Sequence, residues 1–314
     1  MIRTETLRPD AAGISRAAGY LTQGQLVAFP TETVYGLGAD ARNSLAVAGI
    51  FEAKGRPRFN PLIVHVGSAD LARRYVTWSD EAEAMARAFW PGPLTLVLPL
   101  RDDAGLSDLV TAGLPSLAIR VPAHPLAQEL LAAFDGPVAA PSANPSGRIS
   151  PTTAAHVLAG LGGRIAAVLD GGPCPVGLES TILSLTGTPT LLRHGGLAIE
   201  AITALLGTPP AQETSPHSIT APGQMASHYA PLARVQLNMH TAPEGAVLLG
   251  FGAVEGDLNL SPTGSLTEAA ANLFPYLHRL DALNAAMIAV APIPETGLGH
   301  AINDRLRRAA APRP

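Results

Sequence analysis

Residues 51–66 read FEAKGRPRFNPLIVHV, an amphipathic segment that passes through a Gly- and Pro-containing loop into an apolar run. Apolar residues recur near helical spacing over 44–54, with Asn43 or Ser44 as the N-cap and Gly55 at the stop. The following PLIVHV reads as a strand. A helix that leads directly into a buried strand is typical of α/β proteins, and this stretch therefore predicts an α/β fold.

The alternation of strand and helix patterns continues along the chain. Further strands are predicted at residues 25–29, 94–98, 117–121, 137–140, 166–169, 181–185, 190–193, 234–238, 246–251 and 286–291. Further helices are predicted at residues 80–90, 126–134, 153–161, 198–206, 266–279 and 299–310. Two strands follow Thr181 with no helix between them, so we expect a mixed sheet surrounded by helices rather than an all-parallel winding.

The chain has 314 residues, and a typical domain of roughly 100–200 residues suggests two domains. Residues 207–234 carry five prolines and little periodicity, which is typical of a linker. Strand and helix patterns resume after this segment. We therefore expect a first domain over residues 1–206 and a small C-terminal α/β domain over residues 235–314.

The composition argues against several classes of protein. Apolar residues make up 47% and charged residues 15% of the chain, which is typical of a globular protein. The net charge of −4 provides no global basic field for nucleic acid. The N-terminus has no apolar h-region, and the longest apolar run, over 285–293, is too short for a bilayer, which needs about 20 residues. Cys174 is the only cysteine, so no internal disulfide is possible and a reducing cytoplasm is expected.

Lys54 is the only lysine, and the other 20 basic residues are arginines. Lys54, Arg56 and Arg58 lie within five residues, on a loop that Gly55 and Pro57 make irregular and stiff. Cations on a rigid loop beside a sheet suit a polyphosphate, with lysine as a compact point charge. A solvated basic loop at a helix C-terminus explains the same residues equally well. The chain has neither a GxxxxGK[ST] loop nor a GxGxxG after a strand.

Two further loops place small polar residues at predicted strand ends. PTETVYGLG (30–38) follows the first strand, and APSANPSG (140–147) follows the strand PVAA. Loops at strand ends hold ligands in α/β sheets, and hydroxyl and amide side chains can bind phosphate oxygens. The alternatives are an ordinary connection for the first loop and a chain of Asx and Ser turns for the second.

Single polar residues in or beside apolar strands are candidates for ligand contacts. Alternation places His65 with Ile63 on one face of its strand, where a lone histidine is more often a hydrogen-bonded core group than a ligand. Arg120 lies in the apolar strand LAIRV and needs an anionic partner, because an unpaired buried charge is very costly. A substrate carboxylate and an internal Asp or Glu would both serve. Ser180 opens a strand after a Gly-rich loop, and HYAP (228–231) is unusually aromatic for a tether.

Taken together, these motifs resemble the YrdC-like L-threonylcarbamoyladenylate synthases. The resemblance rests on KGRPRFNPLIVHV, PTETVYGLG, PSANPSG, the LEST run at 178–181 and HYAP, and it covers residues 25–193 densely. The Pro-rich linker and the ending APIPETGLGHAINDRLRRA resemble the long, two-domain form of that family. The resemblance implies a twisted mixed sheet around a concave, positive cavity, followed by a small Rossmann-like α/β domain.

The resemblance also implies an activity, in which L-threonine, bicarbonate and ATP give L-threonylcarbamoyl-AMP and diphosphate for N6-threonylcarbamoyladenosine in tRNA. Mg²⁺ would be carried by the phosphates, with no metal ligand from protein side chains. Downstream threonylcarbamoyl-transferase proteins would take the product, with at most a weak contact to tRNA. The linker over 207–234 is the candidate lid of the cavity, because a carbamate is labile in water.

The family's contacts carry over residue by residue. The implied threonine contacts are Thr33, His65, Arg120, the backbone at Ala140, and Ser180. The implied contacts with ATP or its product are Lys54, Arg56, Asn60, Ser116, Ser142, Asn144, Ser150, Arg193 and Tyr229. Lys54 and Arg56 are interpreted as the catalytic residues, because both would neutralise phosphate charge during the transfer.

Two departures from the family pattern bear on the contact expected for Tyr229. The usual LRPG turn is LRHG here, with His194, and PGQMAS precedes HYAP without the basic residues of some relatives. A non-catalytic protein that binds structured RNA is the competing interpretation, against which the net charge and the 4% aromatic content argue. A carbamoyl-transfer module of a maturation enzyme is a third, and the short chain without zinc-finger cysteines argues against it.

Overall fold

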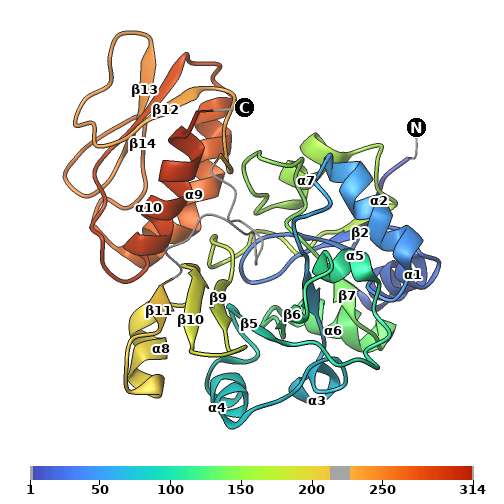
Figure 1. Ribbon diagram of the computed structural model, residues 1–314. Helices are drawn as coiled ribbons and strands as arrows, with labels where there is room; N and C mark the ends of the chain where they lie inside the picture. The colour runs from blue at the N-terminus through green and yellow to red at the C-terminus, as the bar shows by residue number, and fades with distance from the viewer. Residues whose placement is uncertain (1–2, 213–226, 313–314) are drawn as a thin grey trace.

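The computed structural model describes residues 3–212 and 227–312, which form two packed units, each built on its own sheet (Figure 1). Within these residues, the larger sheet has eleven strands in the order β1-β8-β2-β3-β7-β4-β6-β5-β9-β10-β11. It mixes parallel and antiparallel pairs, as predicted. The smaller sheet, in the order β12-β15-β13-β14, has only parallel pairs among the described residues.

The strands of the larger sheet are β1 (Glu5–Leu7), β2 (Val27–Phe29), β3 (Gly36–Asp40), β4 (Ile63–His65), β5 (Leu94–Pro99), β6 (Ser116–Arg120), β7 (Val138–Ala139), β8 (Ala167–Leu169), β9 (Thr181–Ser184), β10 (Thr190–Arg193) and β11 (Ala211–Gln212). The helices of this unit are α1 (Ala11–Thr22), α2 (Ser44–Lys54), α3 (Ala69–Ala72), α4 (Asp80–Phe89), α5 (Asp108–Thr111), α6 (Pro125–Phe134), α7 (Ala154–Leu161) and α8 (Ile199–Leu206). The second unit comprises β12 (Arg234–Gln236), β13 (Ala246–Gly250), β14 (Leu258–Asn259), α9 (Leu266–Asp281), β15 (Met287–Val290) and α10 (Gly299–Ala310). Every predicted element is present, and its bounds lie within about two residues of the prediction.

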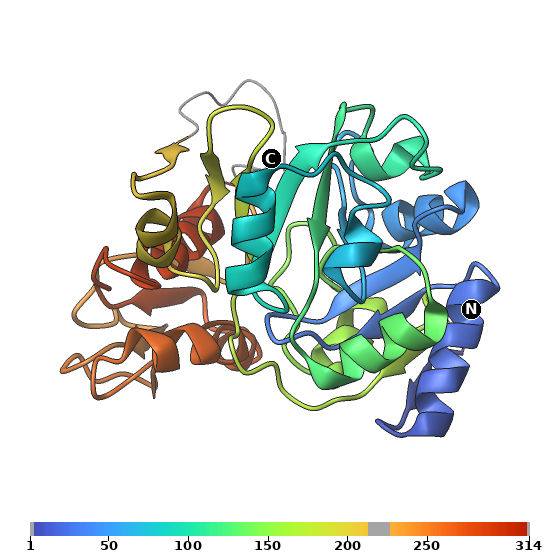
Figure 2. The same ribbon diagram turned by 90° about the horizontal axis from the view of Figure 1, so that it is seen from below.

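Helix ends follow the local sequence. The Asn43 side chain accepts hydrogen bonds from the first backbone amides of α2, and Gly55 ends the helix in the left-handed region with φ 61°. Ser79 and Thr153 cap α4 and α7 in the same way. Helices cover both faces of the larger sheet, with α2 on one core cluster and α1 and α6 on another (Figure 2). No helix in the described part of the chain has the length and apolar character needed to cross a membrane.

Strand β4 separates a polar cavity from the main core. Leu62, Val64 and Val66 are wholly buried in the largest apolar cluster, whereas Ile63 and His65 line the cavity on the other face. The alternation predicted for this strand is therefore confirmed. Parallel pairing of β4 with β6 places His65 directly beside Arg120.

The prediction that residues 30–38 form one loop was wrong in part, because β3 begins within this range, at Gly36. Its sequence GLGAD lacks the β-branched and aromatic residues that favour strands, so its pattern gave no strand signal. Close packing explains the composition. A Cβ at Gly38 would lie 2.9 Å from the Phe29 ring and 3.0 Å from a methyl of Val138, so only glycine lets β3 pack beside these side chains. The first strand and helix, β1 and α1, were also not predicted.

The second unit packs against the first through helices. α9 and α10 lie on the side of the small sheet that is turned toward the larger unit (Figure 1). His278 of α9 stacks on His156 of α7, with ring centroids 3.9 Å apart. Arg305 of α10 reaches Glu179 in the loop before β9, with its Nε 2.9 Å from a carboxylate oxygen. The interface therefore carries polar and charged groups beside apolar residues of the first unit, Val34, Ile149 and Leu178, which pack into the apolar cluster of the second.

The segment predicted as a linker, 207–234, is attached to a sheet or a buried wall at both of its described ends. β11 pairs with β10 at the edge of the larger sheet, and His228 and Tyr229 are buried. Residues 213–226, at the middle of the predicted lid, lie outside the described residues. The described ends of the segment therefore belong to the packed units and do not form a tether.

The stacked histidines predict a pH-dependent stability. Burial and the neighbouring His278 lower the pKa of His156 to about 4, against about 6.5 for an unfolded histidine. Below pH 6.5 the unfolded chain binds this proton first, so the stability that this group contributes is present above that pH and is lost as the pH falls toward 4. We expect the melting temperature of His156→Gln to fall less between pH 7 and pH 5 than that of the unsubstituted chain.

The measurement is thermal unfolding followed by circular dichroism at each pH. His240→Gln is the matched control, because His240 is an exposed histidine of the second unit. Equal pH slopes for the unsubstituted chain and both variants would contradict the prediction.

Candidate active site

A cavity lies over β4 and β6, and His228 and Tyr229 form part of its wall next to the second unit. The walls come from the loops after β2, α2 and β7, from the segment before β9 and from the end of β10. Nine of the predicted site residues line it: Thr33, Arg56, His65, Arg120, Ala140, Ser142, Ser180, Arg193 and Tyr229. Residues that are distant in sequence are thus brought together as expected, while their individual contacts with substrates stay predictions.

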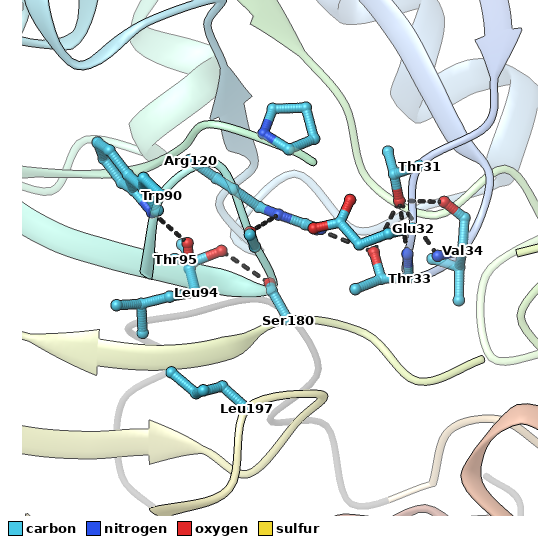
Figure 3. A network of polar contacts seen from close by, with 12 residues as sticks. Thr31, Glu32, Thr33, Val34, Trp90, Leu94, Thr95, Arg120, Ser180 and Leu197 are labelled. Atoms are coloured by element: carbon cyan, nitrogen blue, oxygen red, sulfur yellow. Dashed lines mark hydrogen bonds and ion pairs between the residues drawn. The ribbon is translucent and has the colours of Figure 1, made fainter. Parts of the chain in front are cut away.

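Arg120 has an internal carboxylate partner. Its Nη2 lies 2.7 Å from Oε1 of Glu32, and both side chains are almost fully buried. Its Nη1 donates to Oγ1 of Thr33 at 2.9 Å, and its Nε donates to the Gly92 carbonyl at 3.1 Å. Figure 3 shows the guanidinium directed toward Glu32 and Thr33. The burial of Arg120 is therefore explained without a substrate carboxylate, although the contact with Glu32 leaves hydrogen-bonding capacity unused.

Three buried polar atoms of the Arg120–Glu32 pair lack a hydrogen bond in the described part of the chain. Within the described residues, neither carboxylate oxygen of Glu32 nor Nη2 of Arg120 has a partner in hydrogen-bond geometry, because the close pair is misaligned. Buried polar atoms of native proteins are nearly always hydrogen-bonded. A ligand with a carboxylate or an amine would supply the missing bonds.

Ser180 and Arg193 form a second polar group of the cavity. Oγ of Ser180 lies 2.7 Å from Oγ1 of Thr95 on β5 (Figure 3). Nε and Nη2 of Arg193 donate to the Ser180 carbonyl at 3.1 and 2.8 Å. The guanidinium of the last β10 residue thus fixes the backbone at the start of β9.

Lys54 does not line the cavity. Its Nζ donates to the carbonyls of Ser142 and Asn144, each at 2.5 Å, and the side chain is 3% exposed. Burial and the neighbouring Arg56 lower the pKa of this ammonium well below its ordinary value. Lys54 therefore holds the loop that carries Ser142 into the cavity. A compact ammonium with three donors fits between two backbone carbonyls, whereas a planar guanidinium has a larger, fixed fork.

Four other predicted nucleotide contacts also lie outside the cavity. The Asn144 side chain donates to the carbonyls of Pro145 and Arg148, which stabilises its own loop. Asn60 is fully buried, and its amide atoms have no partner among the described residues. Ser116 begins β6, at the opposite end from Arg120. Ser150 is linked to the cavity through Glu179, to which its Oγ donates at 2.5 Å.

Sequence reasoning missed two charged residues of this region. Glu179 lines the cavity, although it was read only as part of the LEST run. Arg305 supports Glu179 from the second unit and is completely buried. The sequence gives little signal for Arg305, because an arginine in an amphipathic helix normally faces solvent.

The buried charges are strongly unbalanced. Among the described residues, the buried basic side chains are Lys54, Arg56, Arg120, Arg193 and Arg305, and the buried carboxylates are Glu32 and Glu179. Burial lowers the pKa of Arg56 to about 10, with Arg193 contributing, so Arg56 remains charged at neutral pH. An excess of buried positive charge without matching carboxylates favours an anionic ligand.

Other titratable groups in and near the cavity are held in their neutral forms. Burial and Arg120 lower the pKa of His65 to about 3, and burial with Arg56 and Lys54 lowers that of His228 well below its ordinary value. Burial raises the pKa of the Cys174 thiol to about 12, which argues against a reactive thiolate. No group of three or more possible metal ligands of the His, Cys, Asp and Glu types occurs among residues 3–212 and 227–312.

Comparison with known protein families agrees with this architecture. A family model named Sua5_yciO_yrdC, described as telomere recombination, matches residues 19–195. A second, described as the C-terminal domain of threonylcarbamoyl-AMP synthase, matches residues 197–311. The first match covers β2 to β10 of the larger sheet, and the second covers the smaller sheet together with α8 and β11 of the first unit.

Individual relatives are similar over nearly their whole length. The chain is 41% identical to the threonylcarbamoyl-AMP synthase of Pyrococcus abyssi, covering 94% of this chain and 93% of the relative. It is also 41% identical to that of Bacillus subtilis, covering 99% and 96%. The crystal structure of P. abyssi Sua5 complexed with L-threonine superposes with a TM-score of 0.89 at 38% identity, over 99% of this chain and 97% of the other. The chain therefore belongs to the Sua5/YciO/YrdC family and has its long form, in which a Sua5 C-terminal domain follows the larger one.

Proposed function

We propose that this protein is a threonylcarbamoyl-AMP synthase, which converts L-threonine, bicarbonate and ATP to L-threonylcarbamoyl-AMP and diphosphate. The observation that carries the proposal is the cavity itself, which in the described structure is lined by three buried arginines, Arg56, Arg120 and Arg193, against one carboxylate, that of Glu179. Relatives that share most of the chain carry the same name. The substrates fit the charges, because ATP and the threonine carboxylate are both anionic.

The cavity has two ends that suit the two organic substrates. Arg120, with Thr33 and His65 beside it, would receive the threonine carboxylate, and the neutral imidazole of His65 adds no charge. Arg56 and Arg193 would face the phosphates. The unpartnered oxygens of Glu32 lie beside Arg120 and would accept from the threonine amine.

The chemistry requires positioning and neutralisation of charge. The uncharged threonine nitrogen attacks the carbon of bicarbonate. As the C–N bond forms, one C–O bond breaks and that oxygen leaves as water with the proton lost by the nitrogen, which gives a carbamate. A carbamate oxygen then bonds to the α-phosphorus of ATP, the bond from that phosphorus to the bridging oxygen breaks, and diphosphate leaves with the negative charge. Arg56 and Arg193 would stabilise the charge on the phosphates during this displacement.

Mg²⁺ is proposed as an ion carried by the ATP phosphates, where it would neutralise further charge. This arrangement fits the residues present, because both buried carboxylates already lie next to arginines.

The product is proposed to pass to threonylcarbamoyl-transferase proteins for modification of tRNA, with only a weak contact of this chain to tRNA. A cytoplasmic location is proposed because these substrates and partners occur there. Binding of structured RNA without catalysis is not favoured, because the basic side chains that lack matching carboxylates are buried, in the cavity wall or behind it, and are not exposed on the surface.

Release of diphosphate should depend on threonine and bicarbonate. We expect the purified chain to release diphosphate from ATP and Mg²⁺ only when both are added, as followed by a coupled diphosphate assay. Threonylcarbamoyl-AMP should appear in equal amount by mass spectrometry. Release that is independent of threonine, or none under any condition, would contradict the proposed function.

Removing the guanidinium of Arg120 should weaken threonine binding selectively. Loss of a charge-assisted hydrogen bond costs roughly 1.5–3 kcal/mol, so the KM for threonine should rise about tenfold or more while the KM for ATP changes little. Arg120→Ala is combined with Glu32→Gln, because the single change would leave a buried carboxylate unpaired. Arg101→Ala, which removes an exposed arginine paired with Asp103, is the control. An unchanged threonine requirement in the double variant would reject the carboxylate role.

Lys54→Arg tests whether the lone lysine has a special role. The larger guanidinium cannot occupy the space between the carbonyls of Ser142 and Asn144 without moving that loop. We expect kcat/KM for ATP to fall about tenfold or more in both Lys54→Arg and Lys54→Ala. The control is Arg164→Ala, which removes an exposed cation that donates to the Ala53 carbonyl near the end of the same helix. An arginine variant with activity within about threefold of the unsubstituted chain would show that any cation serves.

A further inference from the structure

Arg305 lies in the middle of α10 in the second unit, yet its side chain is completely buried against the first unit. Its Nε donates to Oε2 of Glu179 at 2.9 Å. Its Nη1 donates to the His194 carbonyl and to Asp304, each at 2.8 Å. Burial alone would lower the pKa of Arg305, but Tyr229, Glu179 and Asp304 outweigh it and raise the pKa above the ordinary value. The side chain is therefore a fixed, permanently charged contact between the two units.

Glu179 is the first of two cavity residues that Arg305 holds. It is the only acidic residue among those that line the described cavity. One carboxylate oxygen accepts from Arg305 and the other accepts from Ser150, so both oxygens are held away from an incoming phosphate. Without the arginine, a buried carboxylate would be left beside the proposed triphosphate site.

Tyr229 is the second cavity residue that Arg305 holds. The guanidinium carbon lies 5.2 Å from the centre of the tyrosine ring, a distance at which a cation and an aromatic face attract each other. Phe274 of α9 packs on the same ring at 5.7 Å. The Tyr229 backbone has φ 62°, a left-handed conformation that a bulky residue adopts only when its surroundings fix it. The two helices of the second unit provide those surroundings.

We propose that Arg305 is a positioning residue of the active site, through which the second unit holds Glu179 and Tyr229 in place on the nucleotide side of the cavity. This inference rests on the proposed function. It assigns to the C-terminal domain a part in ATP binding that goes beyond attachment. Because no hydrogen bond or ion pair joins Glu179 or Tyr229 to Arg120 in the described structure, the effect should fall mainly on the nucleotide and much less on threonine.

The test compares Arg305→Lys and Arg305→Met in the full chain, with KM measured separately for ATP and threonine. We expect the KM for ATP to rise about tenfold in Arg305→Met and less in Arg305→Lys, which keeps the charge. The KM for threonine should stay within about twofold. Arg307→Ala is the matched control, because Arg307 lies on the same helix but is exposed and paired only with Glu295 in the described structure. Equal effects on both substrates, or a change in kcat alone, would show a merely structural role and overturn the proposal.

Arg305→Met/Glu179→Gln guards against loss of folding, since it removes both charges and leaves no buried carboxylate unpaired. We expect the double variant to melt at a higher temperature than Arg305→Met, closer to the unsubstituted chain. Its KM for ATP should remain at least about fivefold above that of the unsubstituted chain. A double variant with the unsubstituted KM for ATP would overturn the proposal.

Calorimetric binding of α,β-methylene-ATP separates this proposal from the proposed function, because it needs no turnover. A chain that binds the analogue but releases no diphosphate would contradict the synthase activity alone. Equal affinity of the unsubstituted chain and Arg305→Met for the analogue would contradict the role of Arg305 alone.

Discussion

The excess of buried positive charge is the constraint on which the rest of the structure depends. In the described residues, five basic side chains are buried with only two carboxylates, and burying an unpaired charge is costly. The protein manages this cost with backbone carbonyls. Lys54 donates to two of them, and Arg193 to that of Ser180. Each such bond also fixes a loop that lines the cavity, so the groups that hold the charges also shape the site.

The same constraint explains how the two units are joined. Arg305 enters the first unit as a buried cation, and Glu179 receives it. The pair lies next to Ser150, Arg193 and Tyr229, so the contact between the units and the wall of the cavity share residues. Stacking of His156 on His278 adds a second polar contact nearby. The second unit is therefore part of the architecture of the site.

Much of the fold followed from local patterns. The helix over 44–54, its Asn43 cap and its Gly55 stop were predicted as observed, because each depends on neighbouring residues alone. The faces of β4 followed from strand alternation. Strand β3 could not be predicted in this way. Its Gly38 is required by close contacts with Phe29 and Val138, which lie on other strands and do not show in the local sequence.

The partners of the charged residues show the same limit. Arg120 visibly needed an anion, but nothing in its strand identified Glu32 as that anion. The lone lysine pointed to a special position, yet its partners are backbone carbonyls 88 and 90 residues away. Every residue has a backbone carbonyl, so the residue types of a sequence do not show which carbonyl will accept a hydrogen bond. The burial of Arg305 could not be predicted for a related reason. An arginine in an amphipathic helix is expected on the surface unless the unit that packs against it is known.

A thermal-shift comparison of two nucleotide ligands tests the central claim most directly. If the unbalanced buried charge is what binds ATP, α,β-methylene-ATP at about 100 times its Kd should stabilise the chain by about 2.7 kcal/mol and raise its melting temperature by several degrees. Adenosine, which lacks the phosphates, should raise it by less than about 1 °C at the same concentration. Equal stabilisation by adenosine and by the phosphate-bearing analogue would show that the buried cations do not hold the phosphates and would contradict this account.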